Sequence, residues 1–197
     1  MKLLSFLRPV LEAAAVVGVV LVVLRLLSGL FSRKSHVYQP TAFRQFTLLF
    51  WPVLCLAVGL PFLVSFFLAE YTSAYELGLL LALAALVLGF SVPAFVLHTY
   101  YYFINQHTTL VFDPKQNVLE VYEASVRIPF GKSDIRQVEY VTCRSERLFW
   151  SPYVYLRLHL RSGEILTLTS LLVKLAPVAE FLRNTPLEHR QRWLCWP

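Results

Sequence analysis

The chain has 197 residues, of which 57% are hydrophobic and 15% are charged, and its formal net charge is +6. This composition is too apolar for an ordinary soluble domain, and the length excludes a large enzyme with a membrane anchor. The basic residues are dispersed among acidic ones, so the positive charge does not indicate a nucleic-acid partner; membrane topology explains the excess more simply.

The two halves of the chain differ in composition. Every stretch long enough to cross a bilayer lies before His107, whereas the rest carries 12 of the 18 Lys and Arg residues and nine of the 12 Asp and Glu residues. We therefore expect a membrane domain over 1–106, a water-facing domain over 107–187 and a C-terminal tail over 188–197.

The first apolar segment covers residues 9–31 and carries Glu12 near one end and Arg25 near the other. We expect an additional membrane helix here, in which Arg25 snorkels to one interface and Glu12 lies near the opposite one. An uncleaved signal-type anchor and a helix lying in the interface are the alternatives.

Two longer apolar segments follow, and we expect helices over about 46–69 and 77–104. The first contains 24 residues without a charge, which is about 36 Å of helix against a hydrocarbon core of about 30 Å. The second ends in an aromatic cluster of the kind found at headgroup level. A short polar turn joins them, so the sequence predicts an antiparallel hairpin of membrane helices.

The charges near these segments predict the orientation of the chain. The loop before the hairpin carries three basic residues, whereas the hairpin turn carries only two glutamates. By the positive-inside rule, that loop and the C-terminal domain lie on the cytoplasmic side. Two basic residues near the N-terminus indicate the reverse if segment 9–31 spans. We expect an integral membrane protein whose C-terminal domain is cytoplasmic.

Beyond His107 the hydrophobic residues alternate with the period of a β-strand. We expect strands over 108–112, 118–122, 126–130, 135–143, 153–161 and 166–169. Pro177 suits the first turn of an amphipathic helix that ends near Asn184. The predicted fold is therefore α+β: membrane helices followed by a small antiparallel β domain that a C-terminal helix closes.

The stretch Ile128-Pro129-Phe130-Gly131-Lys132-Ser133-Asp134-Ile135-Arg136-Gln137-Val138 resembles a known family, the bacterial pleckstrin-homology-like membrane proteins. In that family an isoleucine-proline pair, an aspartate-isoleucine pair and a later valine recur, followed by two strands around a Ser-Gly or Asp-Gly turn and a closing helix. The resemblance covers residues 46–184 and implies a PH-like fold at a bacterial inner membrane. It implies a fold more than a function. Segment 9–31 is extra to the simplest family form.

One candidate interaction face lies on the strand over 153–161. Alternation places five aromatic and cationic side chains on its water-facing side: Tyr153, Tyr155, Arg157, His159 and Arg161. Such a face suits lipid headgroups or a partner protein. An ordinary solvated strand face shows the same alternation.

A candidate membrane-surface loop follows the strand over 135–143. It puts charge beside aromatic side chains, in the residues Arg144, Arg147, Phe149 and Trp150. This composition suits a loop that dips into the membrane interface, or equally one that packs against the hairpin. The terminal segment 193–196, with two tryptophans, has the same character.

No motif of the chain indicates an enzyme. None of the five histidines has a metal-like spacing, and the sequence has neither a nucleophile elbow nor a Gly-rich phosphate loop. We expect no catalytic residue, metal or cofactor. The sequence favours a non-enzymatic, membrane-anchored interaction module that binds a partner protein or lipid headgroups. The alternative is an accessory subunit of a larger membrane complex or transport system. Expected partners are membrane lipid and a membrane protein or a second copy of the chain.

Overall fold

A computed structural model describes residues 12–13, 15–24, 26, 36–67 and 73–197. It has an α+β architecture and divides into two compact units. The helical unit contains Leu49–Phe95 and the described residues up to Ser32. The sheet unit contains Val96–Pro197 and the described residues of Arg33–Leu48.

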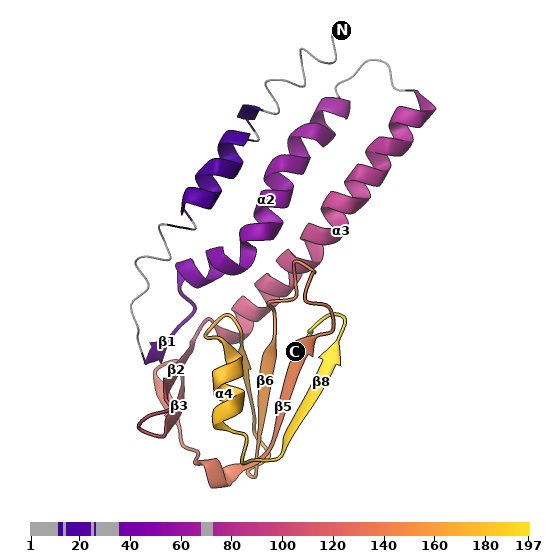
Figure 1. Cartoon of the computed structure of the whole chain (residues 1–197). Coiled ribbons are helices and arrows are strands. Elements are labelled where there is room, and N and C mark those ends of the chain that lie inside the picture. The colour runs from indigo at the N-terminus through magenta and orange to yellow at the C-terminus, as the bar shows by residue number, and fades with distance from the viewer. Residues whose placement is uncertain (1–11, 14, 25, 27–35, 68–72) are drawn as a thin grey trace. The chain divides into compact units, whose positions relative to one another are not determined.

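Two long helices, α2 (Ala42–Phe67) and α3 (Ala74–Asn105), run through the first half of the chain, as predicted. Both are long and apolar enough to cross a membrane. Within the helical unit they lie side by side (Figure 1) and bury Leu63, Leu80 and Val87 between them. A glycine permits their close approach, because a Cβ built at Gly59 would lie 2.5 Å from Cγ2 of Val87.

The N-terminal segment contains a shorter apolar helix, Ala15–Leu24. Glu12 also has helical backbone, whereas Arg25 lies outside the described residues. Several valines of this helix are exposed, among them Val16 and Val19. A membrane span over 9–31 therefore stays a prediction.

Four strands form the first antiparallel sheet, in the order β1-β2-β3-β4. They are β1 (Val37–Tyr38), β2 (Thr108–Asp113), β3 (Val118–Glu123) and β4 (Val126–Ile128). The last three agree with the sequence, and β1 was not expected. A two-residue link, Ala124-Ser125, joins β3 to β4 with φ angles of 46° and 70°, the left-handed conformation that two-residue hairpin loops of type I′ require.

Four further strands form the second sheet, in the order β7-β6-β5-β8. They are β5 (Ile135–Cys143), β6 (Tyr155–Leu160), β7 (Ile165–Thr169) and β8 (Leu187–Arg192); a short 3-10 helix, η1 (Lys132–Asp134), precedes β5. The predicted tail was wrong, because most of β8 lies within it. The strand pairs are antiparallel, as predicted, except that β8 pairs with β5 in parallel. The sequence of β8 shows no alternation of apolar and polar residues, because β8 is an edge strand whose side chains are mostly exposed.

The core of the sheet unit lies between the two sheets and the helix α4 (Leu175–Phe181). Figure 1 shows α4 beside β6. Its apolar face contributes Leu175, Val178 and Ala179 to the core. Because β8 follows α4, the helix is not the last element of this unit, as we had expected it to be.

Candidate interaction surfaces

The expected face on β6 is only partly exposed. Arg157 and His159 are half-buried and Arg161 is exposed, but Tyr153 and Tyr155 are fully buried, so the prediction that all five side chains face water was wrong. Tyr153 is covered by the C-terminal part of α3, which belongs to the sheet unit. Nδ1 of His98 lies 3.1 Å from the hydroxyl of Tyr153, and the ring of Tyr101 packs edge-on against the Tyr153 ring at 5.5 Å.

The remaining part of this face is built around a buried carboxylate, Glu139 of β5. Its side chain is only 7% exposed. Oε1 lies 3.2 Å from Nη1 of Arg190 on β8, and Oε2 lies 3.7 Å from Nη1 of Arg157 on β6. Nε2 of His159 is 3.9 Å from the same Oε2. Strands β6 and β8 thus bring two arginines and a histidine to one acid of β5, and we call these four residues the Glu139 cluster.

The cationic groups of the Glu139 cluster lie on its outer side. The side chain of Arg157 is 31% exposed and that of Arg190 is 48% exposed, so water and ligands meet guanidinium groups rather than the carboxylate. Each guanidinium has five N–H donors, and the contacts to Glu139 occupy few of them. The cluster can therefore offer hydrogen-bond donors to an anionic or acidic group.

A second acid, Glu188 on β8, orders the edge of this surface. Nε of Arg190 donates a 2.6 Å hydrogen bond to Oε1 of Glu188, and Nε2 of Gln137 donates a 2.8 Å bond to Oε2. The bond from Arg190 lowers the pKa of Glu188, and the same bond raises the pKa of Arg190. Arg190, a member of the Glu139 cluster, thus also pairs with a second acid.

The sequence did not point to Glu139, Glu188 or Arg190. A signal for Glu139 was present, since a lone carboxylate stands between Val138 and Tyr140 in the apolar middle of the strand. A buried carboxylate requires a charge partner. Its partner Arg190 lies on β8, whose exposed residues show no apolar alternation, so the sequence does not indicate the pairing.

The expected membrane-surface loop is exposed only in part. Arg144 and Arg147 are exposed and Phe149 is half-buried, but Trp150 is 6% exposed. Its indole N–H donates a 3.0 Å hydrogen bond to the carbonyl oxygen of Trp193. Trp150 therefore packs inside the sheet unit, and the expectation that it faces the membrane surface was wrong.

A group of exposed aromatic side chains lies instead at the end of α3 and in the terminal segment. Trp193 is 62% exposed and Trp196 is 39% exposed. The ring of Trp196 stacks on that of Tyr100, with centroids 4.5 Å apart. We call Tyr100, Trp193 and Trp196 the aromatic patch.

The described part of the chain contains no group of three or more His, Cys, Asp or Glu side chains that could hold a metal ion. In a comparison with protein families, the family model described as a PH domain matches residues 37–181. That range starts at β1, includes both long helices and ends at the last residue of α4. Neither the curated proteins nor the solved structures give a match.

Proposed function

Because the chain belongs to the PH domain family, we propose that it is a membrane-anchored, non-enzymatic interaction module. PH domains are generally binding modules for lipids or proteins. In this proposal α2 and α3 hold the chain in the bilayer, and the sheet unit provides the binding surface. Tethering raises the effective concentration of a surface site, so a site of modest affinity suffices.

The observation that carries the anchoring is the exposure of apolar surface on the two helices. In their most apolar stretches only 28% of the residues of α2 and 22% of those of α3 are buried. A core helix of a soluble protein buries its apolar side chains against the rest of the protein. Lipid is the solvent that removes the cost of leaving them uncovered.

Fractionation of cells that express the full chain tests this anchoring. We expect the chain to stay with the membranes through an alkaline carbonate wash and to be released by detergent. Recovery of a monodisperse chain in buffer without detergent would contradict the proposal, because the apolar faces of α2 and α3 would then be covered by protein.

The Glu139 cluster is the proposed binding surface for anionic lipid headgroups or an acidic partner protein. Its test uses the full chain in nanodiscs of phosphatidylcholine, with or without phosphatidylglycerol, and amide hydrogen exchange in β6 and β8. We expect anionic lipid to slow exchange there, and high salt to reverse the effect because charge contacts are screened. The variant R157Q/R190Q should lose the effect, whereas R183Q, which removes an exposed charge on the α4 side, should keep it.

A partner protein would give a different outcome. Amide hydrogen exchange in β6 and β8 would then not depend on lipid charge, and the full chain would co-purify in fixed proportion with other membrane proteins. Both results together would make the chain an accessory subunit of a larger complex. Loss of that co-purification in R157Q/R190Q would assign the contact to the Glu139 cluster.

The aromatic patch is proposed to lie at headgroup level. Tyr100 follows the uncharged run of α3 by three residues, which is about 4.5 Å along a helix, and tryptophan and tyrosine favour the interface. For sidedness we propose that the sheet unit is cytoplasmic in a bacterial inner membrane. A membrane-impermeant maleimide should then label an R161C variant only in opened vesicles, and labelling in intact spheroplasts would reverse the assignment.

A further inference from the structure

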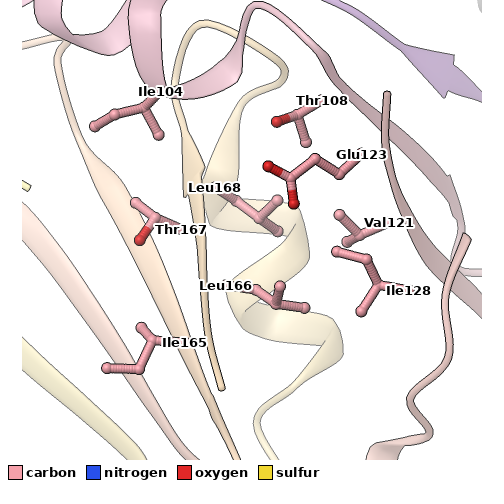
Figure 2. Close-up of a pocket in the computed structure, with 9 residues that line it drawn as sticks. All are labelled: Ile104, Thr108, Val121, Glu123, Ile128, Ile165, Leu166, Thr167 and Leu168. Atoms are coloured by element: carbon pink, nitrogen blue, oxygen red, sulfur yellow. The ribbon is translucent and has the colours of Figure 1, made fainter. Parts of the chain in front are cut away.

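A pocket of about 210 Å³ opens between the two sheets of the sheet unit. Figure 2 shows residues of the first sheet facing residues of β7 across it. Its lining is mostly apolar, and Glu123 at the end of β3 supplies its only charge among the described residues: Ile104, Thr108, Val121, Glu123, Ile128, Ile165, Leu166, Thr167 and Leu168. The volume is below the roughly 300–1,000 Å³ of small-molecule sites, so it suits single side chains better than a whole ligand.

One wall of this pocket is the free edge of β7. Leu166 and Leu168 face Leu158 and Leu156 in the ladder with β6, and the N–H of Leu160 bonds the carbonyl of Glu164. Hydrogen-bonded pairs alternate along an antiparallel ladder. The backbone groups of Ile165, Thr167 and Thr169 therefore point away from β6, towards the pocket side.

The side chain of Asn105, at the end of α3, already occupies part of this edge. Its Nδ2 donates a 3.0 Å bond to the carbonyl oxygen of Thr167, and its Oδ1 accepts a 3.0 Å bond from the N–H of Thr169. An amide side chain has the donor and acceptor of a peptide group, so Asn105 pairs with β7 as one residue of a neighbouring strand would. The edge is thus shown to accept strand-like pairing.

The rest of the edge lacks such a partner within the described part of the chain. The N–H and C=O of Ile165 and the N–H of Thr167 continue the row beyond Asn105, and the side chain of Ile165 is 54% exposed. An added strand would place alternate side chains into the pocket, two residues apart. Figure 2 shows the carboxylate of Glu123 directed into this space.

We propose that the β7 edge and this pocket form a docking groove for an extended segment of a partner protein, which pairs with Ile165 and Thr167 by β-strand addition. The segment places an apolar residue and, two positions away, a lysine or arginine into the pocket, where the basic group pairs with Glu123. Main-chain bonds supply affinity in this mode of recognition, and the alternate side chains supply specificity. This inference rests on the proposed interaction-module function and names the partner class.

The test uses the full chain in detergent and a fluorescein-labelled peptide, Thr-Val-Thr-Lys-Thr-Val-Thr. We expect saturable binding in fluorescence polarisation, with NMR shifts of the Ile165 and Thr167 amides. Glu123→Gln should weaken binding about twofold to fivefold, the effect of losing one solvent-exposed ion pair. Glu123→Lys should reverse the preference, so that the peptide with glutamate in place of lysine binds better.

Two further variants distinguish binding in the groove from non-specific binding of the peptide. Ile165→Pro removes an edge N–H that no ladder bond uses, a substitution that edge strands tolerate, and should abolish binding while circular dichroism stays unchanged. Glu180→Gln, at an exposed acid of α4, should bind as the unaltered chain does. If either variant fails to fold, the peptide preference of Glu123→Lys still tests the groove.

Four outcomes would contradict the proposed docking groove. In the first two, the peptide binds without shifting the Ile165 and Thr167 amides, or Glu123→Lys binds both peptides equally well. In the other two, the chain forms a concentration-dependent dimer that pairs two β7 edges, or holds a lipid or detergent chain in the pocket. If peptide binding fails while the chain remains membrane-integral, only the groove falls. If the peptide binds but the chain proves soluble without detergent, only the anchoring falls.

Discussion

The hydroxyl of Tyr101 donates a 2.7 Å hydrogen bond to the carbonyl oxygen of Cys195. Both residues are fully buried, and 94 positions of sequence separate them. The bond fixes the terminal segment to the end of α3 within the sheet unit. Trp193 accepts a bond from Trp150 nearby, so the terminal segment is a packed part of this unit.

Tyr101→Phe removes that bond without removing the ring. It leaves the Cys195 carbonyl buried without its donor, which costs about 1–3 kcal/mol. We expect a lower free energy of unfolding for the full chain in detergent, measured by thermal or denaturant unfolding. Tyr102→Phe alters a partly exposed neighbour on the same helix and should have little effect. Equal stability of the two variants would show that the bond contributes nothing.

Asn105→Ala should uncover the edge of β7. It deletes the bonds to the Thr167 carbonyl and the Thr169 N–H, at about 0.5–1.5 kcal/mol each. Native-state hydrogen exchange should show faster exchange at Thr169, while amides of β2 and β3 change little. Unchanged protection at Thr169 would mean that another group bonds this edge.

Gly59→Ala should weaken the packing of α2 on α3. The new Cβ would lie 2.5 Å from one Val87 methyl carbon and 2.9 Å from the other, and a valine side chain is stiff. Gly89→Ala is the matched control, because nothing lies within 4 Å of its Cβ; alanine there should be neutral or slightly stabilising. We expect only Gly59→Ala to lower the thermal stability in detergent, and Val87→Ala to restore part of the loss.

Ser125→Gly should stabilise the β3–β4 hairpin. Ser125 has a φ of 70°, and a left-handed conformation costs an L-residue about 1–2 kcal/mol that glycine avoids. We expect a gain of up to about 1 kcal/mol in the free energy of unfolding, because glycine also raises the entropy of the unfolded chain. Ser133→Gly, in η1, should not stabilise the chain; a loss of stability in Ser125→Gly would contradict the argument.

Stability should fall in alkaline solution through Cys195. Burial raises the pKa of its thiol from 9.0 to about 12, so the folded chain holds this proton more tightly than the unfolded chain does. The resulting stability is complete below pH 9 and is lost as the pH rises towards 12. Cys195→Ala should show a shallower decline of unfolding free energy across that range. Parallel curves for the two proteins would contradict the shifted pKa.

The sequence predicted those elements whose signal is local. The uncharged runs of α2 and α3, the bounds of β5 and the place of Pro177 in α4 follow from hydropathy, alternation and helix-start chemistry. Alternation also identified which side chains of β6 share a face. It could not identify what covers that face, because Tyr153 is buried by α3, which lies about fifty residues earlier in the chain.

The Glu139 cluster shows the same limit. Its members lie on three strands, and Arg190 is brought to Glu139 only by the parallel pairing of β8 with β5. Strand β8 has almost no buried side chain, so hydropathy gives no sign of it. Long-range pairing through backbone bonds leaves no periodic trace in the residues that form it.

The exposure of β8 also has a kinetic consequence. Its side chains are mostly on the surface, so it is held by backbone bonds to β5, by the contacts of Glu188 and Arg190, and by the His189 ring stacked on Tyr140, rather than by buried apolar area. Segments of this kind open at low free energy while the core stays closed. We therefore expect the amides of β8 to exchange faster than those of the central strand β6, and opening of β8 would free the edge of β5 for pairing with another chain.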